Sequence, residues 1–283
     1  MTTNRTSLTQ LLVHLDTSSH CAPRLELARA VARDHGATVA ALYAVTPSLV
    51  ALPFAPDGGA AAASILQEID ENYRVQARKV FDVVLKKEGP AVTWAESTGF
   101  PVASSFVSQA LYADLLVLGQ HDSTGPSSGV PTDFVESVLA DSGKPALVLP
   151  YEPVPPAIGK TVVIAWKPTR ESARAVAASL PFLQRASRIH VQSWGEHVDN
   201  EIFGAQLTLD NYLKRHGVDV TWHREIGAEP DAMGELLLSR CADLDADLLV
   251  MGCYGHSRAR EWVLGGTTRT VLRSMTLPVL MSH

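Results

Sequence analysis

The sequence predicts an α/β protein made of two tandem copies of one unit. Three observations predict it: a repeated apolar segment, a regular alternation of strand and helix patterns, and a proline-rich stretch between the copies. Ala113–Gly119 (ADLLVLG) recurs 133 residues later as Ala246–Gly252 (ADLLVMG), and residues 113–149 match residues 246–282 at 11 of 37 positions without a gap. Self-similarity at a fixed shift is the signature of a duplicated structural unit.

The first copy alternates between apolar strand patterns and helix patterns. Its predicted strands cover 10–16, 38–45, 91–96, 114–118 and 145–149, and its predicted helices cover 19–35, 64–88, 101–112 and 133–142. Gly36 is a predicted helix C-cap. Thr46–Ser64 is rich in Ala, Gly and Pro and is interpreted as a loop. Within 64–88, one helical stripe contains the apolar residues Ile65, Ile69, Tyr73, Ala77, Val80, Phe81 and Val84.

The second copy follows the same pattern. Its predicted strands cover 161–166, 188–193, 218–223, 247–251 and 278–282, and its predicted helices cover 170–184, 200–216, 230–242 and 266–274. Alternating strands and helices imply a mostly parallel sheet covered by helices. Leu115–Leu118 and Leu248–Met251 are uniformly apolar, as central strands buried on both faces require. Ligands bind such sheets beyond the carboxyl ends of the strands.

The domain boundaries follow from the repeat. We expect an N-terminal unit at 1–150, a stiff proline-rich linker at 151–159 and a C-terminal unit at 160–283.

Composition excludes several classes of protein. The chain has 283 residues and a formal charge of −6, which argues against general nucleic-acid binding because that needs a basic surface. No apolar run approaches the roughly 18–20 residues that span a bilayer, and the N-terminus has no apolar stretch of signal-peptide length. Three widely spaced cysteines suit a reducing compartment better than a disulfide framework. We therefore expect a cytoplasmic protein that does not bind nucleic acid or a membrane.

A glycine-rich motif directly follows the strand predicted at 247–251. It consists of Gly252 and Gly255, nine residues, and then Gly265, Gly266, Thr267 and Thr268 at the start of a predicted helix. Glycines let the backbone approach a ligand closely, and the free N–H groups of a helix N-terminus favour phosphate. His256, Arg258, Arg260 and Arg269 add local positive charge to an acidic chain. The motif therefore predicts a site for a small phosphorylated ligand, although tight turns and helix caps use the same residues.

This segment resembles the nucleotide-binding signature of the universal stress protein family, Gly-x-x-Gly, nine residues and Gly-Ser/Thr. One departure is Gly266, which stands where ATP-binding members have Ser or Thr. The resemblance covers essentially the whole chain as two units. It implies that each unit is flavodoxin-like (Rossmann-like), with five parallel strands in the order 3-2-1-4-5. It also implies an intramolecular pseudo-dimer in which the strands 145–149 and 278–282 each dock against the other unit.

The resemblance implies ATP or a related adenine nucleotide as the ligand, held in the C-terminal unit. Val191 and Met251 would flank the base. Lys167 stands where ATP-binding members have an Asp after the first strand, and it would either pair with phosphate or fill the adenosine site and weaken binding. The predicted ligand-binding residues are Lys167, Val191, Met251, Gly252, Gly255, His256, Arg258, Gly265, Gly266, Thr267 and Thr268.

The N-terminal copy differs at the same places. It keeps the acid as Asp16, but its loop is Gly119-Gln-His-Asp122, and Asp133-Phe134 replaces the Gly-Ser/Thr pair. A carboxylate there would repel phosphate, so we expect at most one nucleotide per chain.

The leading interpretation is a stress-response regulator that acts by binding a nucleotide rather than by turnover. Two other interpretations stay open. One is a scaffold for protein–protein contact that binds no nucleotide, and the other is a slow ATPase or nucleotidyl-transfer enzyme. Protein partners are unknown, and two chains could pair as a homodimer.

Other motifs carry less weight. Gly125-Pro-Ser-Ser-Gly129 matches a nucleophile elbow but lacks the required strand–serine–helix context. No His or Cys spacing predicts a metal site. Cys253 is interpreted as an unreactive loop thiol, and no catalytic residue is predicted.

Overall fold

The computed structural model describes residues 7–51, 59–123, 129–153, 155–194, 207–225, 232–254 and 266–283. The chain divides into two compact units, Leu8–Pro156 and Ala157–His283. Within the described ranges, no helix has both the length and the apolar character needed to cross a membrane.

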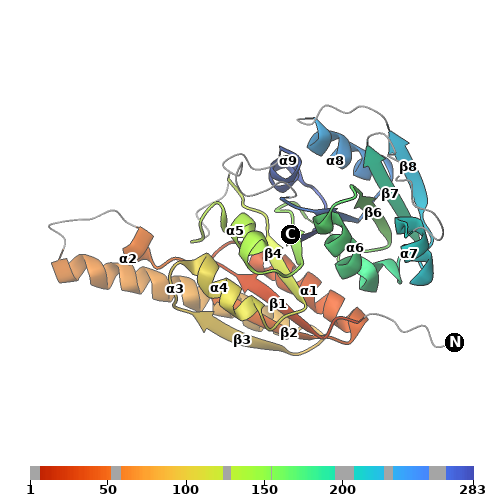
Figure 1. Cartoon of the computed structure of the whole chain (residues 1–283). Helices are drawn as coiled ribbons and strands as arrows, with labels where there is room; N and C mark the ends of the chain where they lie inside the picture. The colour runs from red at the N-terminus through yellow and green to blue at the C-terminus, as the bar shows by residue number, and fades with distance from the viewer. Residues whose placement is uncertain are drawn as a thin grey trace. The chain divides into compact units, whose positions relative to one another are not determined.

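The N-terminal unit is a parallel sheet with the strand order β3-β2-β1-β4-β5, which confirms the order 3-2-1-4-5 (Figure 1). Its strands are β1 (Gln10–Leu15), β2 (Thr38–Ala44), β3 (Val92–Ser97), β4 (Leu115–Gly119) and β5 (Ala146–Leu149). Its helices are α1 (Cys21–His35), α2 (Ser48–Ala51), α3 (Gly59–Leu85), α4 (Val102–Ala110) and α5 (Phe134–Asp141). Gly36 ends α1 with φ 69°, a left-handed conformation that glycine adopts without strain, so the predicted C-cap is confirmed.

The C-terminal unit repeats this order as β8-β7-β6-β9-β10. Its strands are β6 (Thr161–Ala165), β7 (Arg188–Trp194), β8 (Thr221–Glu225), β9 (Leu248–Gly252) and β10 (Val279–Ser282). Its described helices are α6 (Arg170–Leu183), α7 (Leu209–Arg215), α8 (Met233–Asp243) and α9 (Gly266–Ser274). The bounds of α9 agree with the predicted helix at 266–274.

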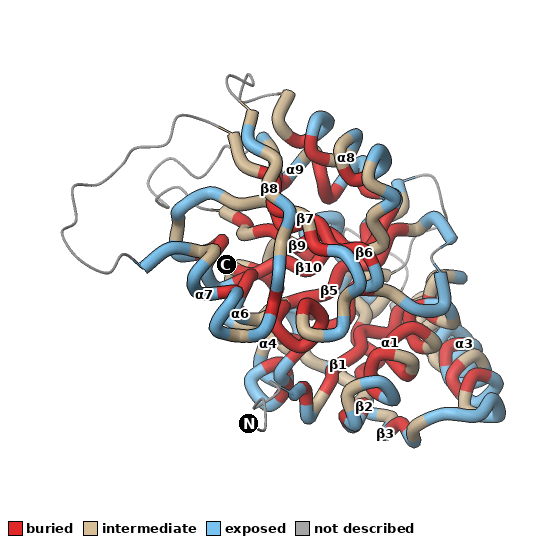
Figure 2. The backbone as a smooth tube through the Cα atoms, turned by 90° about the vertical axis from the view of Figure 1, so that its right-hand side faces the viewer, coloured by how far each residue is buried: buried red, intermediate tan, exposed pale blue. Residues whose placement is uncertain are grey.

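Helices cover the sheet of each unit on both faces. Crossovers between parallel strands are right-handed, so the helices before and after the reversal of strand order lie on opposite faces. Accordingly, α1 packs against α3 and α4 packs against α5, while α8 packs against α9 in the second unit. Figure 2 shows the buried residues concentrated in the central strands and on the inner sides of these helices. The apolar runs in β4 and β9 are buried, as predicted.

A carboxylate ties the first and fourth strands together at the amino end of each sheet. Asp114 accepts hydrogen bonds from the backbone N–H groups of Thr9 and Gln10, at 2.8 and 3.0 Å. Asp247 accepts three, from the N–H groups of residues 159–161, each at 3.0 Å. The same contact in both units is a structural sign of the duplication.

The prediction of a loop over Thr46–Ser64 was wrong at both ends of this stretch, while residues 52–58 lie outside the described residues. Ser48–Ala51 form α2, and α3 begins at Gly59. Four consecutive alanines, residues 60–63, favour this early start because alanine is the best helix former. Ser48 fixes α2 against α3 by donating its hydroxyl to Asp70 at 2.6 Å.

The apolar stripe of α3 is only partly buried. Ala77, Phe81 and Val84 pack into the core, whereas the side chains of Ile65, Ile69 and Tyr73 are exposed. In Figure 1 the first half of α3 runs out from the sheet towards α2. The spacing of the apolar residues predicted a helix, but the helix extends beyond the sheet on which its second half packs.

The strand predicted at 218–223 begins three residues later, at Thr221. The preceding residues close α7 instead. Gly217, with φ 73°, takes the left-handed conformation, and the N–H of Val218 bonds to the carbonyl of Leu213 at 3.0 Å. The helix C-terminus therefore uses residues that the hydropathy pattern assigned to the strand.

Candidate functional site

The candidate ligand site of the C-terminal unit lies where β6 and β9 end side by side. Gly252 closes β9, and a Cβ at this position would lie 2.5 Å from the backbone N of Ser172 and 2.6 Å from the carbonyl carbon of Glu171. The start of α6 therefore packs directly on Gly252. This contact alone requires glycine there, independently of any ligand.

The first residues after Gly252 turn away from the strand in a constrained way. Cys253 donates its N–H to the carbonyl of Ser282 at 3.0 Å and accepts a hydrogen bond from Nδ1 of His283 at 3.2 Å. Tyr254 has φ 59°, a left-handed conformation that is uncommon for a residue with a side chain. Backbone in this conformation is frequent in anion-binding turns and at functional sites.

The helix that follows the loop starts without a carboxylate. No acidic residue lies in the first turn of α9, whereas its counterpart α5 carries Glu136 there. Gly266 is exposed, Thr267 is half-buried and Thr268 is buried. The start of α9 is thus electrostatically compatible with an anion, because a helix N-terminus carries partial positive charge.

A buried carboxylate opposes this arrangement. Glu171 is 2% exposed and forms an ion pair with Arg170. Burial alone would raise the pKa of Glu171, but hydrogen bonds from Arg170, Thr169 and its own backbone hold that pKa below the usual value. Glu171 is therefore charged beside Gly252. A negative charge here would repel a phosphate group.

Cys253 is 1% exposed, and burial together with the charge of Glu171 raises the pKa of its thiol to about 12. A protonated, inaccessible thiol is a poor nucleophile and a poor metal ligand. This agrees with the prediction of an unreactive cysteine.

The other predicted ligand-binding residues fall into three groups. Lys167 is exposed, just beyond the end of β6. Val191 and Met251 are buried in β7 and β9, and Val191 lies three residues before the end of its strand. Gly255, His256, Arg258 and Gly265 lie outside the described residues, as does most of the nucleophile-elbow match at 125–129. The site residues therefore stay predictions.

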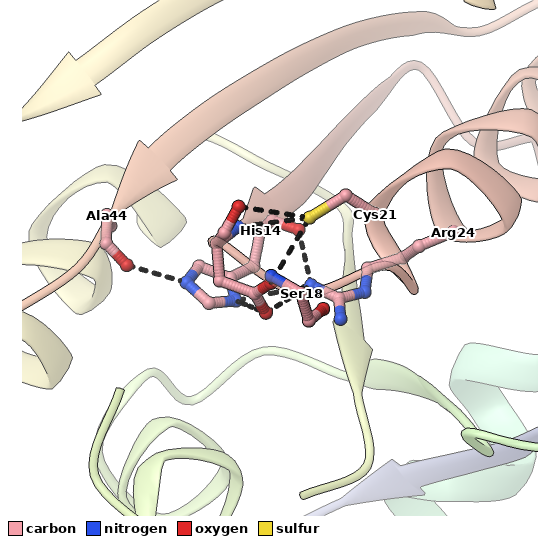
Figure 3. Close-up of polar contacts among 6 residues, drawn as sticks. His14, Ser18, Cys21, Arg24 and Ala44 are labelled. Carbon is pink, nitrogen blue, oxygen red and sulfur yellow. Dashed lines mark hydrogen bonds and ion pairs between the residues drawn. The ribbon is translucent and has the colours of Figure 1, made fainter. Parts of the chain in front are cut away.

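The same end of the N-terminal unit contains a buried polar cluster, which we call the Arg24 cluster. It consists of His14, Asp16, Cys21 and Arg24 (Figure 3). Nη1 of Arg24 donates to Oδ2 of Asp16 at 3.1 Å and to the carbonyl of His14 at 2.8 Å. Oδ1 of Asp16 accepts from the N–H of Ser18 at 2.7 Å and from the Cys21 thiol at 3.2 Å.

Charge is balanced inside the cluster. Arg24, His14 and the N–H of Ser18 outweigh the effect of burial and hold the pKa of Asp16 well below its usual range. Burial lowers the pKa of His14 to about 4 and raises that of the Cys21 thiol to about 12. Asp16 and Arg24 are thus charged, while the imidazole and the thiol are neutral. A neutral imidazole beside an unionised, buried thiol has no activated nucleophile to offer.

The geometry also fixes the tautomer of His14. Nε2 lies 2.8 Å from the carbonyl of Ala44, which can only accept, so Nε2 carries the proton. Nδ1 then faces Nη1 of Arg24 at 3.5 Å as an acceptor. The ring packs on Phe134, with centroids 4.3 Å apart, and edge-on to Phe106. Phe134, which replaces a motif residue of the C-terminal unit, is therefore a core residue.

Sequence reasoning missed Arg24, Cys21 and Glu171 as members of these sites. Asp16 was noticed through the family resemblance, but its partner lies eight residues later on the buried side of α1. An arginine on the apolar face of an amphipathic helix is the signal that could have found it. Elsewhere, Nδ1 of His190 lies 3.0 Å from Nε2 of His223, yet among the described residues no three His, Cys, Asp or Glu side chains are placed to hold a metal ion.

The fold defines a tandem flavodoxin-like protein. Its two units differ in the residues at the ends of their fourth strands, β4 and β9. The universal stress protein family model matches residues 8–150 and 173–283, and the chain belongs to this family. Both units are therefore universal stress protein domains.

The chain is also similar to individual proteins in sequence or in fold. The chain is 28% identical over 176 residues to the universal stress protein Slr1230 of Synechocystis, an alignment that covers 59% of this chain and 57% of that protein. Its fold is similar to that of a universal stress protein from Archaeoglobus fulgidus, with a TM-score of 0.68 at 17% identity over 96% of this chain and 95% of the other. A functionally unknown Pseudomonas aeruginosa protein, PA1789, gives 0.58 at 16% identity, over 97% and 92% of the two chains.

Proposed function

We propose that this universal stress protein binds ATP or a related nucleotide in its C-terminal unit and acts in the cytoplasm as a stress-response regulator through binding rather than turnover. The observation that carries the proposal is the difference between the two units at the end of their fourth strands. The C-terminal unit keeps the glycine motif and a helix start free of acidic residues. In the N-terminal unit the equivalent end is filled by Arg24.

Each group of the site has a distinct task in this proposal. The backbone at Gly252, Gly255, Gly265 and Gly266 would approach the phosphates, and the start of α9 would supply N–H donors. The hydroxyls of Thr267 and Thr268 would add hydrogen bonds, and Lys167, His256 and Arg258 would add positive charge. Val191 and Met251 would form the apolar surroundings of the base. No residue is assigned to catalysis.

Glu171 gives the proposal a specific electrostatic consequence. Its backbone and Cβ lie beside Gly252 and its charge acts on the neighbouring Cys253, so it should weaken the binding of a polyphosphate. Glu171→Gln removes the charge while keeping the size of the side chain. We expect this variant to bind ATP about 5- to 30-fold more tightly, as roughly 1–2 kcal/mol of repulsion predicts.

Two measurements test the proposal. Mass spectrometry of ligand released from the denatured, purified protein should detect a nucleotide, and calorimetric titration with ATP should give about one site per chain. Gly255→Val should abolish the heat of binding. The matched control is Asp122→Val at the equivalent position of the N-terminal unit, which should leave binding intact. No released nucleotide and no heat would overturn the proposal.

A scaffold function is the second candidate, favoured by the exposed part of α3. Ile65 is 59% exposed, and Ile69 and Tyr73 continue the same apolar stripe. Contiguous exposed apolar surface often marks a protein-binding site. If this face binds a partner or a second chain, Ile69→Glu should abolish the association in sedimentation or pull-down experiments. The same variant should leave the heat of ATP binding unchanged, which separates the two functions.

A further inference from the structure

We propose that Arg24 is a built-in ligand of the N-terminal unit and that its guanidinium permanently closes the carboxyl end of β4. In the C-terminal unit, the glycine motif stands at the corresponding end of β9. The closure concerns the N-terminal unit alone. It holds whether or not the C-terminal unit binds a nucleotide.

The position of the guanidinium carries the first step. A Cβ built on Gly119 would lie 2.1 Å from Nη2 and 2.6 Å from Cζ of Arg24. The guanidinium therefore lies directly on the glycine that ends β4, the counterpart of Gly252. Arg24 is 4% exposed, so its side chain is almost completely shielded from solvent.

The partners of Arg24 carry the second step. Asp16 is the acid that, by the family resemblance, would reach a nucleotide. Here it is 4% exposed and its oxygens accept from Arg24, Ser18 and Cys21. Arg24 thus fills the strand end and also satisfies the acid that a ligand would use.

The counterparts in the C-terminal unit carry the third step. The registers align Leu11 with Leu115 in one unit and Val162 with Leu248 in the other. With this alignment, Asp16 corresponds to Lys167 and Arg24 to the buried Ala175. The acid and the arginine occur together in one unit and are both absent from the other, as expected if the arginine takes the place of an external ligand of the acid.

Removing Arg24 should therefore leave a cation-binding pocket beside Asp16. Arg24→Ala should lower the midpoint of thermal unfolding, because a buried carboxylate loses its counter-ion. Guanidinium chloride between 1 and 50 mM, too dilute to denature, should raise this midpoint in a saturable manner. For a dissociation constant of about 1 mM, 20 mM guanidinium would increase the folding equilibrium constant about 20-fold.

Three controls isolate the pocket. Sodium chloride at the same ionic strength should not rescue Arg24→Ala, and guanidinium should not stabilise the wild type. Asp16→Asn/Arg24→Ala lacks the anion and should not respond. Equal responses of all variants, or no response of Arg24→Ala, would overturn the proposal.

A second measurement covers the case in which Arg24→Ala does not fold. In ¹⁵N NMR spectra of the wild type, the side-chain N–H groups of Arg24 should exchange slowly with water because the guanidinium is enclosed. Arg24 should remain in slow exchange when ATP is added in excess. Exchange at the rate of exposed arginines, or displacement of Arg24 by ATP, would show that the N-terminal unit is open.

Discussion

Replacing His14 with phenylalanine should change how the stability of the N-terminal unit depends on pH. Burial holds the pKa of His14 at about 4 in the folded unit, against 6.5 in the unfolded chain. Between these values the unfolded chain binds a proton that the folded unit does not. The contribution of a neutral His14 is therefore complete above about pH 6.5 and is lost as the pH falls towards 4.

The magnitude follows from the two pKa values. Protonation of the unfolded chain costs the wild type about 2 kcal/mol of stability at pH 5 and about 3 kcal/mol at pH 4. His14→Phe removes this loss but also removes the hydrogen bond to the carbonyl of Ala44, worth about 1–2 kcal/mol at all pH values. The variant should therefore be less stable than the wild type at pH 8 and more stable at pH 4.5. The two stability curves should cross between about pH 5 and 6.

Urea unfolding followed by circular dichroism at pH 8, 6, 5 and 4.5 measures both curves. Because groups outside the Arg24 cluster titrate equally in the two proteins, the difference between the two stability curves isolates the effect of His14 within this cluster. NMR offers a direct check, since the ring protons of His14 should not titrate above about pH 5. Parallel stability curves, or a His14 that titrates near pH 6.5, would refute the reasoning.

Three further predictions concern other parts of the chain. Gly252→Ala should destabilise the protein by about 1–3 kcal/mol in thermal unfolding, because the added Cβ meets backbone atoms of α6 at 2.5 Å; an unchanged midpoint would show that α6 moves freely. Asp247→Ala should cost about 2 kcal/mol and more than Asp114→Ala, because Asp247 accepts three backbone hydrogen bonds and Asp114 two; urea unfolding of both variants makes the comparison. The buried thiols of Cys21, Cys241 and Cys253 have pKa values of about 12, which reduces the thiolate fraction about 1,000-fold. They should therefore react with a disulfide reagent at pH 8 only after denaturation, and fast labelling of the native protein would contradict this.

Much of the fold could be predicted because its signals are local. The buried strands β4 and β9 are continuous apolar runs, and α9 begins at its glycine and threonine residues. Errors arose where one segment serves two elements. Val218 has the hydropathy of a strand residue, but its N–H closes α7. The alanines before Ser64 stand in a stretch rich in Ala, Gly and Pro, a composition that predicts a loop, although alanine itself favours helix.

The candidate site was harder to predict because its charges pair across distant positions. Asp16 carries the same carboxylate whether it is open to a ligand or paired with Arg24, and only the fold reveals the pairing. Glu171 stands in the first turn of α6, where an acidic residue is ordinary. Its burial beside Gly252 depends on how closely α6 approaches β9. The order of residue types along the chain does not show how closely α6 approaches β9.

The ion pair between Asp16 and Arg24 also constrains how the sequence can change. Losing either partner alone leaves a buried charge without a counter-charge, which costs about 3–5 kcal/mol and is a large share of the stability of a domain. The two positions are therefore epistatic: a path from this pair to the Lys and Ala of the other unit passes through an unstable intermediate. A duplicated domain that has acquired such a pair does not regain an open strand end by one substitution. The two units therefore stay different at this strand end.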